Sequence, residues 1–430
     1  MAGLQKKKTA IKPVTNQWQL LADKMKDHTT DYITVEEASA IIRAQTRDYG
    51  AVTIPSSSAS GYILAEDLSA DRDMPPFNRA TVDGIAIRFE AFARGIKTFS
   101  IKATQAAGET PVAIESPEEC IEIMTGAAID SSADTVVRYE DISMANGTAT
   151  LKDIEIANGQ NIHAKGKDKL QGDIVADAGR VITPALLGLA ASIGKTNLLV
   201  KKMPKIIIVT TGNELVSPET TPAPVELRRS NDITVQSVLR QHAVAADTLH
   251  LKDDHISIKN ELSPCLQAYD VILLTGGVSM GKFDYVPQAL NELHVKKLFH
   301  KVKQRPGKPF WFGAHEAGTL VFAFPGNPVS VFMCLHRYFI PWLKSSLGMR
   351  TNTQAYAILQ QDIHFSIPLQ YFIQVKLSSN KHGQLLAEPV STNGSGDFSN
   401  LIYTDAFMEL PLQQNAFRKG EAYPVWRYTN

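Results

Sequence analysis

The strand-to-loop junction between residues 269 and 285 constrains the fold of this chain more than any other segment. Its sequence is Tyr-Asp-Val-Ile-Leu-Leu-Thr-Gly-Gly-Val-Ser-Met-Gly-Lys-Phe-Asp-Tyr. The apolar run 271–274 is typical of a parallel strand covered on both faces, and Gly276 and Gly277 let the backbone approach a ligand closely. The turn therefore predicts an anion site, with Asp284 at its far end as the ligand of a divalent cation.

Two further junctions follow the same plan, at 205–215 (Lys-Ile-Ile-Ile-Val-Thr-Thr-Gly-Asn-Glu-Leu) and at 320–330 (Leu-Val-Phe-Ala-Phe-Pro-Gly-Asn-Pro-Val-Ser). An isolated Gly-Gly is explained equally well as a tight turn. In an open α/β sheet, however, the carboxyl ends of parallel strands meet at one crevice. The three glycine-bearing loops are therefore predicted to converge on one site.

The composition narrows the class of protein. A chain of 430 residues predicts about three domains from length alone, and its 44 basic and 44 acidic residues give no bulk attraction to nucleic acid or to an anionic membrane. Cys120, Cys265 and Cys334 are far apart, which disfavours a disulfide framework or zinc site and fits a reducing cytoplasm. No apolar run reaches the roughly 18 residues of a membrane-spanning helix, and residues 1–16 are expected to form a disordered tail.

The segments predict an α/β plus β fold in several domains. Thr34 and Glu37 form a capping box at a helix start, and Asn327 and Pro328 are suited to the N-cap and first position of a later helix. The expected parts are listed by residue: a tail (1–16), a discontinuous mixed linking and dimerisation domain (17–70 and 169–203), a small β-rich domain (71–168), a mostly parallel α/β domain (204–350) and a C-terminal β domain (351–430).

With these segments in place, the chain resembles the MoeA family of molybdopterin molybdenumtransferases, which includes the E domains of gephyrin and of the plant molybdenum insertase. Seven motifs in the family's order carry the resemblance: Pro75-Pro-Phe-Asn-Arg-Ala-Thr-Val-Asp-Gly84, Ile123-Met-Thr-Gly-Ala127, Gly166-Lys-Asp168, Thr210-Thr-Gly-Asn-Glu214, Thr275-Gly-Gly-Val-Ser-Met-Gly281 with Asp284, Arg305-Pro-Gly-Lys-Pro309 and Pro325-Gly-Asn-Pro-Val-Ser330. It covers nearly everything after the tail.

The resemblance implies insertion of molybdenum from molybdate into adenylated molybdopterin, with Mg²⁺-dependent release of AMP. It implies Asp83, Asp254 and Asp284 as metal ligands and catalytic acids, with Glu214 and Thr125 as further catalytic residues. The implied substrate-binding residues are Gly276, Gly277, Ser279, Asp168, Lys301, Arg305, Pro306, Lys308, Asn327, Ser330 and Ser395. The cations among them suit a molybdate dianion, and the acids suit a metal on the pyrophosphate link.

Each candidate also has a structural interpretation. Glu214 could cap the following helix, Asp83 could be a turn aspartate, Thr125 a turn hydroxyl and Ser330 a helix residue. Lys303 and Asp253, by contrast, are interpreted as solvated charges rather than ligands.

Two positions depart from the family pattern. Arg305 stands where many relatives carry lysine, which keeps the charge but changes its geometry. Gln374 stands near a family arginine thought to bind molybdate, so that Lys376 or Lys381 would have to replace that charge, while Ser395 matches a family serine.

The resemblance further implies an elongated homodimer in which Asp83 of one subunit completes the cleft of the other. The pathway's adenylyltransferase and apo-molybdoenzymes are possible protein partners, and neither nucleic acid nor a membrane is expected. The competing hypotheses are a non-catalytic molybdopterin carrier, a gephyrin-like scaffold, and a nucleotide-processing enzyme that shares only the α/β module.

Overall fold

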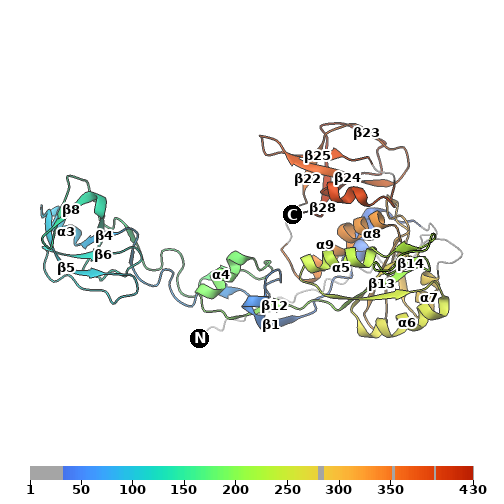
Figure 1. The fold of residues 1–430 in the computed structure, drawn as a ribbon, viewed down its shortest axis with the longest axis horizontal. Helices are drawn as coiled ribbons and strands as arrows, with labels where there is room; N and C mark the ends of the chain where they lie inside the picture. The colour runs from blue at the N-terminus through green and yellow to red at the C-terminus, as the bar shows by residue number, and fades with distance from the viewer. Residues whose placement is uncertain (1–31, 279–284, 351–353, 392–393, 430) are drawn as a thin grey trace, which may run out of the picture. The chain divides into compact units, whose positions relative to one another are not determined.

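The computed structural model describes residues 32–278, 285–350, 354–391 and 394–429. The chain forms two compact units, one made of residues 1–49 and 203–430 and the other of residues 50–202. No helix within the described ranges is long and apolar enough to cross a membrane. Figure 1 labels the elements of both units.

A six-stranded, mostly parallel sheet forms the centre of the larger unit. Its order is β16-β13-β17-β21-β20-β18, and the first four strands are parallel neighbours, whereas β20 runs antiparallel to both β21 and β18. The strands are β13 (Ile206–Thr211), β16 (Ala246–Leu251), β17 (Val271–Thr275), β18 (Lys296–His300), β20 (Trp311–Ala314) and β21 (Leu320–Phe324), with a small pair β14 (Leu215–Val216) and β15 (Leu227–Arg228) outside it.

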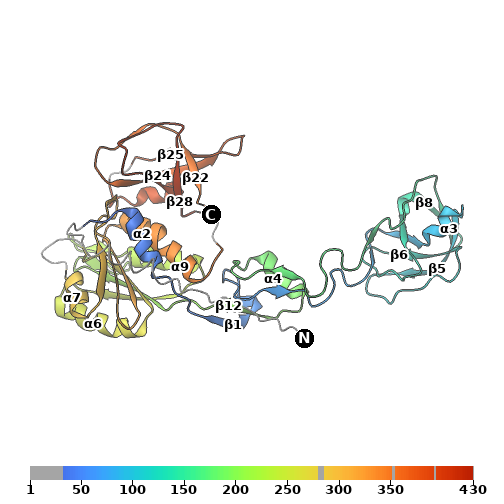
Figure 2. The ribbon, with the colours of Figure 1, turned by 180° about the vertical axis from the view of Figure 1, so that it is seen from behind.

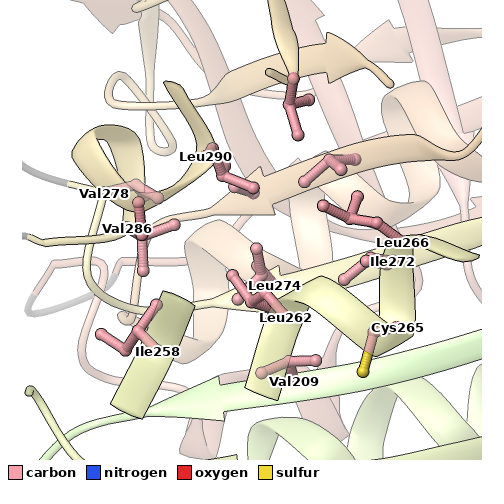
Figure 3. Packing of buried hydrophobic residues seen from close by; sticks show 14 of the residues in the cluster. Val209, Ile258, Leu262, Cys265, Leu266, Ile272, Leu274, Val278, Val286 and Leu290 are labelled. Atoms are coloured by element: carbon pink, nitrogen blue, oxygen red, sulfur yellow. The ribbon is translucent and has the colours of Figure 1, made fainter. Parts of the chain in front are cut away.

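Helices cover both faces of this sheet, which explains why its central strands are apolar throughout. They are α5 (Asn231–Gln241), α6 (His255–Ala268), α7 (Val286–Glu292), α8 (Pro328–Cys334), a π-helical segment (Leu335–Phe339) and α9 (Ile340–Ser346). Figure 3 shows the aliphatic core on the α6–α7 side, where Leu262 and Leu290 pack with Leu274 of β17. The opposite face is aromatic, with Phe322 against Phe339 and Trp342.

Helix α2 (Val35–Arg43) begins as the sequence predicts. Thr34 Oγ1 accepts from the backbone N–H of Glu37 at 3.1 Å, and Glu37 Oε2 accepts from the N–H of Thr34 at 2.8 Å. The helix buries Val35, Ala38 and Ile42 and contacts α9, beside which it lies in Figure 2. It therefore belongs to the unit that carries the α/β sheet.

The C-terminal domain is a small closed β structure. Strand β26 pairs with both β28 and β24, so that β24, β25, β22, β28 and β26 form a ring. The elements are β22 (Tyr356–Leu359), β23 (Ile363–His364), β24 (Gln370–Ser379), β25 (Leu385–Pro389), a 3-10 segment (Ser399–Tyr403), β26 (Ala406–Leu410), β27 (Ala416–Phe417) and β28 (Ala422–Arg427). Strand β19 (Gln304–Arg305) joins it by pairing with β24.

The unit of residues 50–202 contains the predicted β-rich domain. Its six-stranded sheet has the order β7-β4-β6-β5-β9-β8. The elements are β1 (Ala51–Pro55), a 3-10 segment (Ser56–Ser58), β2 (Leu68–Ser69), β3 (Arg79–Ala80), β4 (Gly84–Ile87), α3 (Phe89–Ala93), β5 (Thr98–Gln105), β6 (Glu119–Ile123), β7 (Thr135–Arg138), a 3-10 segment (Tyr139–Asp141), β8 (Ile142–Ala145), β9 (Thr148–Leu151), β10 (Ile162–His163), β11 (Ile174–Ala176), α4 (Pro184–Ser192) and β12 (Asn197–Lys201).

The predicted α/β plus β fold class is confirmed, including the mostly parallel sheet and the C-terminal β domain. The residue boundaries of the four domains stay a prediction. Residues 1–16 lie outside the described residues.

Candidate functional site

Three loops at the carboxyl ends of neighbouring parallel strands surround a cavity of about 890 Å³. They follow β13, β17 and β21, which are adjacent in the sheet. The loops are close, because a Cβ built on Gly326 would lie 3.7 Å from Cα of Gly276. The convergence predicted from the sequence is therefore present, at the edge where open α/β sheets bind ligands.

Gly276 is required by the backbone path of the central loop. Its φ is +96°, and a Cβ there would stand 2.7 Å from the carbonyl oxygen of Thr211 on the neighbouring strand. Both the conformation and the space exclude an ordinary side chain. Residue 276 thus brings two strand ends together and leaves the turn open to a ligand.

Two buried hydroxyls line the cavity without a hydrogen-bond partner in the described part of the chain. Thr211 and Thr275 are 4% and 1% exposed, and neither Oγ1 has a hydrogen-bond partner among the described residues. A buried unsatisfied polar group costs about 1–3 kcal/mol. A ligand oxygen in the cavity would supply the missing partner, so these hydroxyls favour a binding site over a structural turn.

The segment from Arg305 to Lys308 forms a cationic side of the cavity together with Pro306. Buried Gln304 supports it, because its Nε2 donates to the carbonyl of Gly307 at 2.8 Å and its Oε1 accepts from the Tyr338 hydroxyl. The pairing of β19 with β24 fixes Arg305 opposite the C-terminal domain. The exposed cations Arg305 and Lys308 therefore lie on a loop that Gln304 and the β19–β24 pairing hold in place.

Two arginines that sequence reasoning missed complete this positive lining. Arg228 ends β15, and Arg229 follows it just before α5. Arg229 Nε lies 3.9 Å from Oδ2 of Asp232. Together with desolvation, the larger cause, Arg229 holds the pKa of His250 below its usual value. The sequence could have indicated these two arginines, because they lie between a predicted strand and the predicted helix of the same βα unit.

Among the described residues, the carboxylates that line the cavity are Glu214 and Asp253. The loop carrying Asp253 is tied to the loop carrying Glu214, because the N–H of Asn213 donates to Asp253 Oδ2 at 3.3 Å and the N–H of Asp253 donates to Asn213 Oδ1 at 3.1 Å. Asp254 instead caps α6, with Oδ2 accepting from the N–H of Ser257 at 2.7 Å. Asp253, which the sequence analysis interpreted as a solvated charge, therefore lines the cavity, whereas Asp254 does not.

These two carboxylates suit Mg²⁺, which is usually held by one or two carboxylates, several waters and substrate phosphates. Among the described residues, no group of three or more His, Cys, Asp or Glu side chains is arranged to hold a metal alone.

The C-terminal domain closes one side of the cavity through Ser395, whose Oγ accepts from Asn327 Nδ2 at 2.8 Å. Asn327 occupies the predicted N-cap position of α8, but its side chain makes this contact instead of capping. Ser330, one turn later, is buried and also lines the cavity. Gln374, by contrast, is buried within β24 and does not line it.

Lys301 is buried and lies outside the cavity lining. Its Nζ is 5.1 Å from the centre of the Tyr32 ring, and Lys308 Nζ lies 4.8 Å from the same ring. The N–H of Ile33 donates to the carbonyl of Lys301 at 3.2 Å. The chain entering α2 therefore packs against this basic segment.

Asp83, Thr125 and Asp168 belong to the unit of residues 50–202. Asp83 Oδ1 accepts from the N–H and Oγ1 of Thr125 at 2.6 and 2.7 Å. The backbone bond first, and then the hydroxyl bond, lower the pKa of this exposed carboxyl. Asp168 Oδ1 lies 2.9 Å from Nε2 of His163. Ser279 and Asp284 lie outside the described residues.

Comparison with known proteins gives three consecutive matches, which together cover most of the described chain. Residues 33–194 match the MoeA N-terminal region, domains I and II. Residues 207–345 match a probable molybdopterin binding domain, and residues 356–428 match the MoeA C-terminal region, domain IV. Three of the seven motifs lie in the first matched region and four lie in the second.

A molybdopterin molybdenumtransferase of Synechocystis sp. is 35% identical over 399 residues, which are 92% of this chain and 100% of that protein. The chain belongs to the MoeA family. A molybdopterin molybdenumtransferase of Staphylococcus epidermidis is 29% identical to this MoeA family member over 91% of the chain and 95% of the relative. The resemblance inferred from the seven motifs is confirmed.

The fold of this MoeA family member agrees with solved structures. A molybdopterin biosynthesis MoeA protein from Pyrococcus horikosii superposes with a TM-score of 0.78, at 26% identity, over 93% of this chain and 100% of that one. The chain is thus an enzyme of molybdenum cofactor biosynthesis in the MoeA family.

Proposed function

We propose that the cavity beside β13, β17 and β21 binds adenylated molybdopterin and molybdate, and that the enzyme inserts molybdenum into the pterin dithiolene with Mg²⁺-dependent release of AMP. The observation that carries this proposal is the pair of buried hydroxyls of Thr211 and Thr275. Within the described ranges they have no hydrogen-bond partner, and four described cations line the same cavity. The relatives named molybdopterin molybdenumtransferase support it.

The cationic and the neutral polar residues of the cavity would bind different parts of the ligand. Arg228, Arg229, Arg305 and Lys308 present cations to phosphate and molybdate oxygens, where arginine offers paired N–H donors. The unpartnered hydroxyls of Thr211 and Thr275 hydrogen-bond the same ligand. Cations and hydrogen-bond donors held around the ligand would stabilise a developing anion.

Glu214 and Asp253 are the described residues that would help hold Mg²⁺ here. A bound Mg²⁺ would neutralise charge on the phosphate that leaves with AMP. The roles of Asp284 and Ser279 and the entry of Asp83 from a second subunit stay predictions. So do the homodimer, the cytoplasmic location, and contacts with the pathway's adenylyltransferase and apo-molybdoenzymes.

The decisive experiment measures AMP release from adenylated molybdopterin by the purified full chain with Mg²⁺, with and without molybdate. The product is then added to an apo-molybdoenzyme. We expect AMP release that depends on Mg²⁺ and increases with molybdate, and a product that activates the apo-enzyme. Tight pterin binding without turnover would instead support the carrier hypothesis and contradict the proposal.

A further inference from the structure

A second cavity, of about 590 Å³, lies in the same unit and outside the candidate site. Its walls come from α2, from the π-helical segment and α9, and from β28. These elements are far apart in the sequence. The volume lies within the range of small-molecule sites, about 300–1,000 Å³.

The charge of this cavity has one sign. Arg43, Lys344 and Arg427 line it together with Arg337, and no carboxylate occurs among the described residues of its lining. Arg337 is already paired, because its Nε lies 2.9 Å from Oε2 of Glu409. The other three cations make the cavity attractive to an anion.

A buried imidazole nitrogen in the wall has no hydrogen-bond partner among the residues that the structure describes. His336 is 7% exposed, lies in the π-helical segment and lines the cavity, and its Nε2 has no hydrogen bond among the described residues. Burial, then the charges of His242 and Lys344, lower the pKa of His336 to about 3. The ring is therefore neutral at neutral pH, and Nε2 donates a hydrogen bond when it carries the ring proton.

Apart from Ser39, Ser345 and Gln354, the rest of the lining is aliphatic or aromatic and includes two indoles. Trp342 and Trp426 both line the cavity, with Ile42, Pro341 and Val425 beside them. Apolar walls around a few polar groups are the usual composition of a site for an organic ligand. An inorganic ion alone would leave most of this surface without a partner.

We propose that the second cavity binds a small phosphomonoester with an aromatic or aliphatic body. Its dianionic phosphate contacts Lys344, Arg427 and the Nε2 of His336, and its body packs against Trp342 and Trp426. A dianion is favoured over a monocarboxylate because several cations face the cavity without a lining carboxylate. The site is independent of the proposed insertase reaction.

The test uses the full chain with 5-fluorotryptophan in place of its four tryptophans. Phenyl phosphate is titrated in and followed by ¹⁹F NMR, with signals assigned through Trp342→Phe and Trp426→Phe. We expect both signals to shift saturably, with at least tenfold weaker effects for benzoate and for inorganic phosphate. Absence of saturable shifts at Trp342 and Trp426 would overturn the proposal.

Variants separate this site from the candidate active site. Lys344→Gln and the exposed Arg427→Gln should each weaken phenyl phosphate binding about tenfold, whereas Lys308→Gln should leave the two shifts unchanged. Arg418→Gln is the matched control, because this exposed arginine lies on the C-terminal domain and pairs with Asp362. Equal affinity in the wild type, Lys344→Gln and Arg427→Gln would contradict the proposal, as would loss of binding in Lys308→Gln alone.

Discussion

The two cavities of the larger unit are both rich in cations, yet they are built in different ways. The candidate site is formed by loops that follow strands β13, β17 and β21, and its shape depends on glycine backbone. The second cavity is formed by side chains of α2, α9 and β28. The run from α8 through α9 contributes to both, since Ser330 lines the first and Lys344 the second.

The two cavities also differ in which of their polar groups are paired with other protein groups. In the described part of the candidate site, two threonine hydroxyls have no hydrogen-bond partner, and two carboxylates lie beside the cations. In the second cavity, one arginine is neutralised by Glu409, and that carboxylate stands behind the lining. The first arrangement suits a ligand that binds together with a metal ion. The second suits an anionic organic ligand that binds without a metal ion.

The largest effect is expected from Gly276→Val. Its Cβ would meet the carbonyl of Thr211 at 2.7 Å, so the two loops must separate. We expect AMP release to fall at least about 1,000-fold, which corresponds to about 4 kcal/mol, while phenyl phosphate binding in the second cavity persists. Gly383→Val is the control, because that glycine also has a positive φ, +75°, but faces open space. Equal losses in both variants would mean that backbone strain, not closure of the site, is responsible.

Glu409→Gln should give the next largest effect, on stability. This carboxylate accepts from Arg337 Nε and Nη2, from Trp426 Nε1 at 2.5 Å and from Gln370 Nε2. All these partners are hydrogen-bond donors, so the side-chain NH₂ of the introduced glutamine would face a donor. The buried guanidinium of Arg337 would also lose its ion-pair partner. We expect urea denaturation to show a loss of about 3–5 kcal/mol. Exposed Glu388→Gln should change the free energy of unfolding by less than about 0.5 kcal/mol.

Lys308→Gln tests the cationic side of the candidate site. We expect binding of adenylated molybdopterin, measured by calorimetry, to weaken about 30-fold, or about 2 kcal/mol, because a charge-assisted contact is lost. Lys303→Gln removes a nearby charge that does not line the cavity and should bind within about twofold of the wild type. Similar weakening in both would indicate general attraction rather than a contact.

His336→Gln tests the burial of the imidazole in the wall of the second cavity, through the pH dependence of folding stability. The pKa of His336 is lowered to about 3, so between pH 6.5 and about 3 the unfolded chain binds a proton that the folded chain does not. Folding stability therefore falls as pH decreases through this window, and the variant should flatten that slope by about one proton. Urea midpoints at pH 4, 5 and 6 measure it. An unchanged slope would assign the acid sensitivity to other groups, His242 first, whose pKa burial and Lys344 lower to about 4.

The smallest loss of stability is expected from Thr211→Val combined with Thr275→Val. Neither hydroxyl has a protein partner among the described residues, so replacing it by a methyl group removes an unsatisfied polar group that costs about 1–3 kcal/mol and should not lower the free energy of unfolding. Pterin binding should nevertheless weaken about tenfold, or about 1.4 kcal/mol. Unchanged binding would show that these hydroxyls do not contact the ligand.

Several residues that line the cavity could be named from the sequence, because strand ends, glycines and helix starts are local signals. Glu214, Gly276 and Asn327 follow predicted strands, and the parallel topology brings them together. The choice between Asp253 and Asp254 could not be predicted in this way, because one residue of register decides which carboxylate caps α6. Gln374 could not be placed either, since its side chain is buried by packing inside the ring of strands.

By itself, the sequence determined the family, the α/β plus β fold and the convergence of three loops, because each depends on patterns within a few residues. The tertiary structure alone decided which polar groups remain without partners. Thr211 and His336 are ordinary residues in the sequence and become informative only when burial removes water from their polar atoms. The second cavity has the same origin, since α2, α9 and β28 meet only in the folded chain.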